Sequence, residues 1–175
     1  EYIDKIAAIM GQPKYASLRI INIIEVDSLP NLITNLDFDT CDTMLTNRGY
    51  IEGIAYAVST LVAFANVYNY VDVCHHAWLG WDDNFGPAAD MYYELAQLAG
   101  PNTIRGFITN TSNYSVLREP HFNLQTDVGG MQARASQWAS YNNYVDELSF
   151  AQAFRDRLIS LGMDSSIGMV IDTSR

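Results

Sequence analysis

The feature that most constrains the fold is a short run of β-branched residues that ends in two carboxylates. Residues 19–25 contain four isoleucines, and Glu25 and Asp27 stand where the run stops. A strand this apolar is expected to be buried on both faces, as in a parallel sheet. Carboxylates at its carboxyl end would lie where barrels and open α/β sheets place their active sites. The run therefore predicts a strand that presents an acid.

The two carboxylates also have structural interpretations. Ser28 or Asp27 could cap the start of a helix, and Pro30 suits its first turn. Glu25 could be a buried, hydrogen-bonded carboxylate with no part in chemistry. Local pattern alone leaves these alternatives open.

Helical and strand-like patterns alternate along the rest of the chain. Alternation of this kind predicts a parallel sheet with right-handed crossovers, and four strands make about half of a (β/α) barrel. We expect residues 1–175 to be one part of a larger catalytic domain. The expected helices are 2–10, 41–64, 87–98 and 146–161, and the expected strands are 17–25, 67–72, 104–109 and 167–172.

Polar side chains follow each expected strand. Because the carboxyl ends of parallel strands lie along the same edge of a sheet, these side chains are predicted to form one site. The pairs are Glu25 and Asp27, Asp72 and His75, Asn110 and Asn113, and Asp172 and Arg175.

A long polar segment, 115–143, shows no clear periodicity. Segments of this length within a compact domain are usually lids or binding loops. Trp138, which lies within it, is a candidate for stacking against a ligand.

The composition narrows the class of ligand. A net charge of −10 argues against nucleic acid and against an anionic membrane surface as partners. No stretch is long and apolar enough for a transmembrane helix. The eleven tyrosines, seven phenylalanines and three tryptophans suit a neutral, stackable ligand such as a carbohydrate, although aromatic residues also build cores.

Other chemistries have weaker support. Asp72, His75 and His76 resemble a metal set, but adjacent histidines on an extended segment point to opposite sides, so we expect no metal site. No glycine-rich phosphate loop follows any strand, which disfavours a nucleotide-binding doubly wound protein. The two cysteines, Cys41 and Cys74, lack metal-site spacing, and a disulfide between them is an open alternative.

Aromatic and amide side chains near the strand ends complete the candidate site. Trp78 and Trp81 could belong to the core, but Gly80 and the polar residues 82–84 favour an exposed loop in which they stack on a ligand. Asn110 and Asn113 begin overlapping glycosylation sequons, yet at strand ends they are better suited to bind hydroxyl groups.

Four segments together resemble glycoside hydrolase family 6, the cellobiohydrolases and endoglucanases, and most closely its bacterial exo-acting members. Residues 23–35, Ile-Ile-Glu-Val-Asp-Ser-Leu-Pro-Asn-Leu-Ile-Thr-Asn, are similar to its IEPDSLxNLxTN segment. Residues 70–81, Tyr-Val-Asp-Val-Cys-His-His-Ala-Trp-Leu-Gly-Trp, are similar to YxDxGHxGWLGW. Residues 106–114 resemble GxxTNxxNY, and residues 172–175 resemble a DxxR strand end.

The resemblance implies a distorted (β/α) barrel with parallel strands and an active site at its C-terminal face. It also implies inverting hydrolysis of β-1,4-glucan, with cellulose and cello-oligosaccharides as partners and no cofactor. We expect a secreted, extracellular monomer. The site residues it implies are Asp27 as general acid, Asp72 and Glu25 as neighbouring acids, Arg175 as their cationic partner, and His75, Trp78, Trp81 and Asn113 as substrate contacts.

The chain departs from the family pattern at several positions. Cys74 and Ala77 stand where the family usually has glycine, and the family's disulfide partner of Cys41 lies upstream of Glu1. A second catalytic aspartate and the family's candidate base are expected upstream and downstream of these residues. The main expectation is release of cellobiose, and the alternatives are an endoglucanase and a glucan-binding module without activity.

Overall fold

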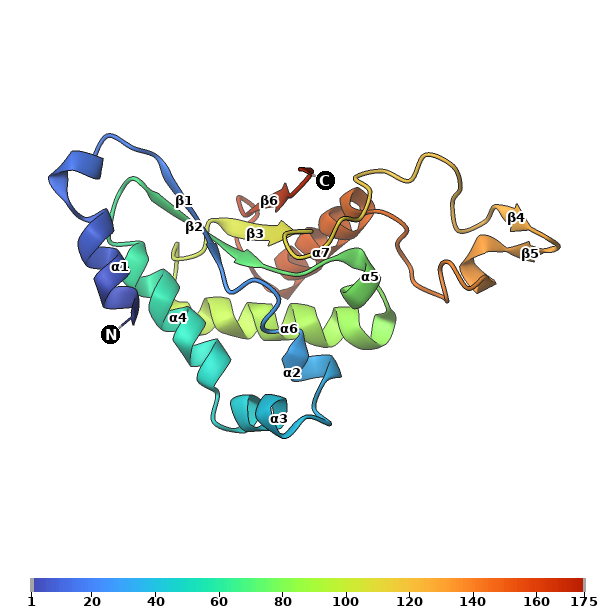
Figure 1. Cartoon of the computed structure of the whole chain (residues 1–175), viewed down its shortest axis with the longest axis horizontal. Coiled ribbons are helices and arrows are strands. Elements are labelled where there is room, and N and C mark those ends of the chain that lie inside the picture. Colours follow the sequence, from blue (N-terminus) through green and yellow to red (C-terminus); the bar gives the residue numbers. More distant parts are fainter. Residues whose placement is uncertain (1, 175) are drawn as a thin grey trace.

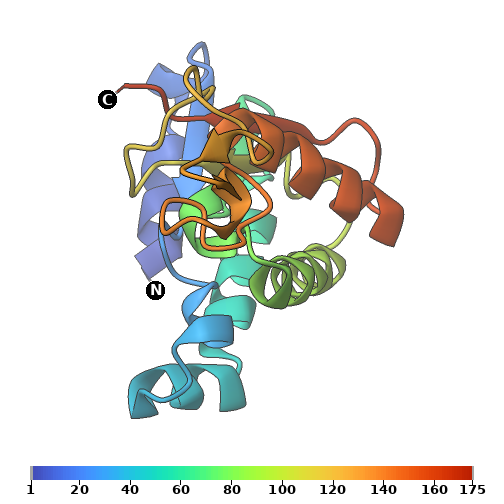
Figure 2. The ribbon, with the colours of Figure 1, turned by 90° about the vertical axis from the view of Figure 1, so that its right-hand side faces the viewer.

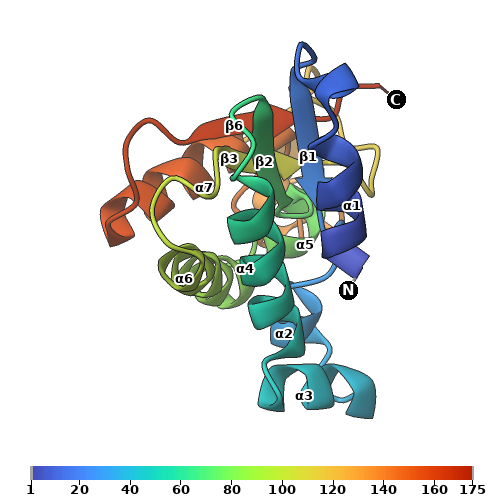
Figure 3. The ribbon, with the colours of Figure 1, turned by 90° about the vertical axis from the view of Figure 1, so that its left-hand side faces the viewer.

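The computed structural model describes residues 2–174, in which a four-stranded parallel sheet is covered by helices on one face (Figures 1 and 3). The strands lie in the order β1-β2-β3-β6, so each new strand joins the same edge, as in a growing barrel. Their bounds are Ile20–Ile24 for β1, Val67–Asp72 for β2, Gly106–Thr109 for β3 and Gly168–Ile171 for β6.

Within residues 2–174, seven α-helices lie between or before these strands. The prediction of helices between parallel strands is confirmed, because α4, α6 and α7 each connect two neighbouring strands. Their bounds are Tyr2–Met10 for α1, Asn31–Thr34 for α2, Asp39–Thr46 for α3, Gly49–Leu61 for α4, His76–Leu79 for α5, Asp82–Ala99 for α6 and Glu147–Leu161 for α7.

The core lies between the sheet and these helices. Phe107 of β3 meets Tyr92 of α6 edge to face, and Tyr92 in turn meets Phe154 of α7 in the same way. Such aromatic pairs add about 1 kcal/mol each to the stability that burial provides. This aromatic contact joins the two longest helices to the middle of the sheet.

The expectation that β1 is buried on both faces is wrong. Ile21 is 59% exposed and Ile23 is 46% exposed, whereas Ile24 is buried. The helices lie on the opposite face, and no described element covers these two side chains (Figure 3). An apolar run shows that a strand is hydrophobic, but it does not show which element covers each face.

Two helices differ from the sequence prediction. The expected helix 41–64 is divided into α3 and α4, because Arg48 adopts a left-handed backbone conformation (φ 59°) between them. Within α4, Ile54 and Val58 are buried as expected, whereas Tyr56 is exposed. Helix α6 begins at Asp82, five residues before Pro87, and acidic residues in its first turn favour the helix dipole.

The alternative that Ser28 or Asp27 caps the helix after β1 is wrong. No side chain caps α2, and the Ser28 hydroxyl instead donates to the carbonyl oxygen of Glu25 at 3.0 Å. Asp146, by contrast, caps α7 by accepting the backbone N–H of Ser149 at 2.9 Å.

The segment 115–143 is irregular, as expected, apart from a small hairpin and one 3₁₀ turn, Ala133–Ala135. Strands β4 (Asp127–Val128) and β5 (Met131–Gln132) pair through Gly129 and Gly130, both at positive φ, as a two-residue hairpin turn requires. The hairpin extends beyond the end of the sheet (Figure 1) and lies nearest the viewer in Figure 2.

Two glycines bring β3 and β6 together. A Cβ atom at Gly106 would collide with the backbone of Gly168, its partner across the strand pair. A larger residue at position 106 must therefore push the strands apart.

We predict that Gly106→Ala lowers the free energy of unfolding by about 1–3 kcal/mol through this overpacking. Gly53→Ala is the matched control, because a Cβ atom at Gly53 in α4 meets nothing within 4 Å. Alanine there should stabilise the helix by about 0.5–1 kcal/mol. Urea unfolding measures both, and equal effects of the two changes would contradict this account of the β3–β6 contact.

Candidate active site

The ends of β1 and β2 are joined through one buried carboxylate. The Oδ2 atom of Asp72 accepts the backbone N–H of Asp27 and that of Cys74, both at 3.0 Å. Asp72 is 1% exposed, and its backbone carbonyl accepts the hydroxyl of Tyr92 at 2.6 Å. The expected meeting of these strand ends is thus observed.

Burial governs the ionisation of Asp72. Desolvation raises the pKa of its carboxyl group, and the N–H bonds from Asp27 and Cys74 oppose that rise because they favour the charged form. The Thr111 side chain acts in the same direction. A carboxylate so enclosed offers no surface to a substrate, and its Oδ2 atom joins the backbone of two segments.

Residues in the left-handed backbone region follow three of the strands. Glu25, Asp27, Cys74 and Asn110 have φ values of 54°, 66°, 54° and 67°. This backbone conformation is disfavoured for residues other than glycine. Residues that adopt it are found most often at functional sites, where the surrounding contacts maintain it. The observation marks this edge of the sheet as the candidate site.

Asn110 connects the next strand ends. Its backbone N–H donates to the carbonyl oxygen of Cys74 at 2.7 Å, and its Nδ2 donates to the carbonyl oxygen of Asp172 at 2.8 Å. Its Nδ2 also donates to the carbonyl oxygen of Ser115, and its Oδ1 accepts the backbone N–H of Ser115. Asn110 is 3% exposed. The amide therefore holds β2, β3 and β6 together, and its expected use as a sugar contact has no exposed group to support it.

Asp27 presents an exposed carboxyl group at this edge. Its Oδ1 atom accepts the thiol of Cys74 at 3.3 Å and the hydroxyl of Ser112 at 3.1 Å. The donors follow β2 and β3, so segments after three strands converge on this one group. Ser112 was not predicted from the sequence, although it lies between Asn110 and Asn113 in a segment that was.

His75 and Asn113 form a pair beside the acid. The Nδ2 atom of Asn113 lies 2.8 Å from Nδ1 of His75. Burial lowers the pKa of His75, since desolvation disfavours its cationic form. A neutral ring that accepts at Nδ1 carries its proton at Nε2, which suits a hydrogen bond to a hydroxyl group.

The three tryptophans have different settings. Trp78 lies in α5 and is half-buried, with Nε1 donating to the Thr34 hydroxyl at 2.9 Å. Trp81 is half-buried, with Nε1 donating to the carbonyl oxygen of Ser140 at 2.8 Å, so the long segment holds it. Trp138 is 68% exposed and contacts the ring of Phe122. The expectation that Trp78 lies in an exposed loop is therefore wrong.

His76 has a separate, structural partner. The Oε1 atom of Glu147 accepts its backbone N–H at 2.9 Å and lies 2.7 Å from its ring Nδ1. Glu147 is fully buried at the start of α7, and the pair anchors α5 to that helix. No pattern in the sequence predicted this buried acid, because its partner is 71 residues away.

Metal and disulfide alternatives receive no support from the described residues. Among residues 2–174 no group of histidine, cysteine, aspartate and glutamate is arranged to hold a metal ion. Cys41 and Cys74 are both free thiols, so the alternative of a bond between them is wrong. None of the described helices combines the length and apolar character that a membrane crossing requires.

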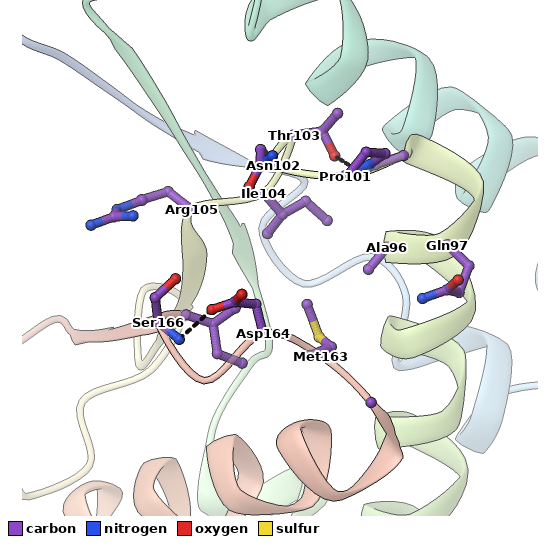
Figure 4. A pocket seen from close by; sticks show the side chains of 13 residues that line it. Ala96, Gln97, Pro101, Asn102, Thr103, Ile104, Arg105, Met163, Asp164 and Ser166 are labelled. Carbon is purple, nitrogen blue, oxygen red and sulfur yellow. Dashed lines mark hydrogen bonds between the residues drawn. The ribbon is translucent and has the colours of Figure 1, made fainter.

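A hollow of about 420 Å³ lies at the opposite end of the strands (Figure 4). It is bounded by the end of α6 and the segments that precede β3 and β6. Its acid, Asp164, accepts the backbone N–H of Ser166 at 2.7 Å within its own turn. The convergent acid and amide groups are thus at the other edge.

The sequence also predicted two further site residues, Glu25 and Asp172. Glu25 is exposed beside Asp27, and Asp172 accepts the N–H and hydroxyl of Ser174 through Oδ1 at 2.9 and 2.7 Å. Arg175, the predicted cationic partner, lies outside the described residues.

The arrangement can be compared with known proteins. The sequence model of the family described as glycosyl hydrolases family 6 matches residues 1–175 of this chain. The chain belongs to this family. The finding confirms the resemblance carried by the segments around Asp27, Asp72 and Asn110.

Individual relatives agree with this assignment. The chain is 40% identical over 178 residues to exoglucanase A of Cellulomonas fimi, and 34% identical over 176 residues to the 1,4-beta-D-glucan cellobiohydrolase CEL6C of Podospora anserina. Both matches cover 100% of this chain, which spans 20% and 40% of the respective relatives.

A solved structure shows the same fold. The catalytic domain of Cellulomonas fimi Cel6B superposes with a TM-score of 0.90 at 39% identity, covering 99% of this family 6 chain and 39% of that domain. The four parallel strands and their helices therefore correspond to part of a family 6 catalytic domain, and the expected α/β architecture of a distorted barrel is confirmed.

The lowered pKa of His75 predicts a pH-dependent stability. The unfolded chain takes up this proton near the ordinary pKa of 6.5, and the folded protein does so only at lower pH. The contribution of the neutral His75 ring to the free energy of unfolding is therefore fully present above about pH 6.5, and it is lost as the pH falls through the lowered pKa. Urea unfolding from pH 8 to pH 4 should show this loss in the parent protein and not in His75→Gln.

His121→Gln is the matched control for that measurement, because His121 is exposed in the long segment. It should keep the pH dependence of the parent protein. An unchanged pH dependence in His75→Gln would refute the assignment of the effect to His75.

Proposed function

We propose that the protein containing this chain hydrolyses the β-1,4-glucosidic bonds of cellulose with inversion, releasing mainly cellobiose, and that Asp27 is its general acid. The observation that carries the proposal is the exposed carboxyl group of Asp27, held at the carboxyl edge of the sheet by groups from the two neighbouring strand ends. The family assignment supports the choice of reaction.

Inverting hydrolysis requires a protonated acid on one side of the scissile bond and a water molecule activated on the other. Asp27 is exposed and can reach a glycosidic oxygen, whereas Asp72 is enclosed. Asp72 is therefore proposed as a positioning residue, which holds the backbone of Asp27, and not as the group that activates water. The reaction uses carboxyl groups and water and needs no cofactor.

The surrounding side chains suit a neutral sugar chain. His75 and Asn113 offer polar atoms beside Asp27, and the rings of Trp78, Trp81 and Trp138 offer apolar faces along the edge and the long segment. Cellulose and cello-oligosaccharides are therefore the proposed partners. Because cellulose is an insoluble polymer, the enzyme is proposed to be secreted and to act outside the cell. It is also proposed to act as a monomer.

Two observations support exo action. The long segment 115–143 extends beyond the carboxyl edge of the sheet, where it could cover a bound chain (Figure 1). The names of both relatives, exoglucanase and cellobiohydrolase, describe exo-acting enzymes.

We predict that Asp27→Asn in the whole protein lowers kcat on cello-oligosaccharides by about 10²–10⁴-fold, the usual contribution of a general acid. The asparagine Oδ1 can still accept the bonds from Cys74 and Ser112, so circular dichroism and the unfolding midpoint should be unchanged. The activity of the variant on an aryl cellobioside with an acidic phenol should fall far less, because that leaving group departs without a proton.

Asp37→Asn, at an exposed position before α3, is the control and should keep full activity. Full activity of Asp27→Asn on cello-oligosaccharides would overturn the assignment of the acid. Tight binding of cello-oligosaccharides by the unaltered protein without hydrolysis would favour a glucan-binding module instead.

The products distinguish exo from endo action. We expect cellobiose to dominate from the first minutes of digestion of amorphous cellulose, measured by chromatography of the soluble sugars. A broad ladder of oligosaccharides, with a rapid fall in polymer length, would identify an endoglucanase instead.

A further inference from the structure

Two side chains donate to the same oxygen of Asp27. The Cys74 thiol lies 3.3 Å and the Ser112 hydroxyl 3.1 Å from Oδ1, and the two approach from the segments after β2 and β3. No other side-chain donor to the carboxyl group of Asp27 is recorded within the described residues. The two bonds thus distinguish Oδ1 from Oδ2.

Cys74 is held firmly in this position. It is fully buried, its backbone N–H donates to Asp72, and its carbonyl oxygen accepts the backbone N–H of Asn110 at 2.7 Å. Its φ of 54° is a conformation that glycine adopts more readily. A side chain at this position is therefore kept against the backbone preference, and it points its sulfur at the acid.

The surroundings keep the sulfur protonated. Burial raises the pKa of the Cys74 thiol, and the negative charges of Asp72 and Asp27 raise it further. The thiol is therefore a hydrogen-bond donor at every working pH and not a nucleophile. The other titratable groups that face this cluster are the buried Tyr92 and the ring of His75, whose pKa is lowered by burial.

We propose that Cys74 and Ser112 are positioning residues that occupy Oδ1 of Asp27 and so place the transferable proton on Oδ2. A proton on Oδ1 would meet the hydrogen atoms of both donors, whereas a proton on Oδ2 meets neither. In the reaction the O–H bond at Oδ2 breaks, its proton passes to the leaving oxygen, and the resulting carboxylate keeps both bonds at Oδ1. This inference rests on the proposed role of Asp27 as general acid.

The donors also affect the transfer of the proton. Removal of either donor frees Oδ1 to carry the proton, which is then shared between two oxygens. Loss of a donor should therefore slow reactions whose leaving group needs the proton and leave reactions with a good leaving group almost unchanged.

The test uses the whole protein with four variants. Cys74→Gly removes the thiol and suits the positive φ, Cys74→Ser keeps a donor, and Ser112→Ala removes the exposed hydroxyl. Ser160→Ala is the matched control for loss of a hydroxyl group, since Ser160 is exposed on α7 away from this cluster. Unfolding midpoints identify any variant that fails to fold.

We expect Cys74→Gly and Ser112→Ala each to lower kcat on cello-oligosaccharides by up to about tenfold. Activity on an aryl cellobioside with an acidic phenol should change little. Cys74→Ser should restore the activity of the parent protein on cello-oligosaccharides, and Ser160→Ala should match the parent throughout. A merely structural role would instead lower activity on both substrates equally.

Infrared spectroscopy gives a second readout that does not depend on activity. The S–H stretch of Cys74 is identified as the band that Cys74→Gly removes. It should move to higher frequency in Asp27→Ala, which lacks the acceptor at Oδ1.

The outcomes separate this inference from the proposed function. If Asp27→Asn is inactive while Cys74→Gly and Ser112→Ala keep the activity of the parent protein on cello-oligosaccharides, the positioning role is overturned and the general acid stands. If Asp27→Asn keeps its activity, the proposed function fails. An S–H stretch at the same frequency in the parent protein and in Asp27→Ala would also overturn the role of Cys74.

Discussion

The site depends on one buried carboxylate. Asp72 places a single oxygen between the backbone N–H groups of Asp27 and Cys74, residues that follow two different strands. A buried carboxylate is costly unless its oxygens are hydrogen-bonded, and two left-handed residues are costly unless their surroundings hold them. Each cost is offset by the same two bonds, so the backbone that presents Asp27 and the carboxylate beneath it depend on each other.

The same principle extends along the edge of the sheet. Asn110 joins Cys74 to Asp172 through its backbone N–H and its side-chain amide, so the ends of β2, β3 and β6 form one hydrogen-bonded row. The aromatic residues are held by a second layer of contacts. Trp78 bonds to Thr34, and the His76–Glu147 pair anchors its helix to α7. The geometry of the candidate acid is thus set by the backbone, and the positions of the candidate stacking rings are set by packing of the connecting segments.

The pattern of apolar residues predicted much of the fold, and its failures have specific causes. Strand β2 and the parallel order of the strands follow from periodicity and alternation, which are local properties. The division of the helix at Arg48 does not, because a left-handed residue depends on the contacts around it. The exposure of Ile21 and Ile23 was missed because a hydrophobic run does not specify what lies against each face.

The sequence by itself determined the family and the strand ends at which the candidate acid lies, because these depend on residue type and spacing within short segments such as 23–35. Only the tertiary structure decided the setting of those residues. It enclosed Asp72, engaged Asn110 within the fold, and brought Ser112 to an acid 85 residues away. Hydrogen bonds between residues so distant in the chain depend on how the strands are placed side by side, and no local pattern encodes that placement.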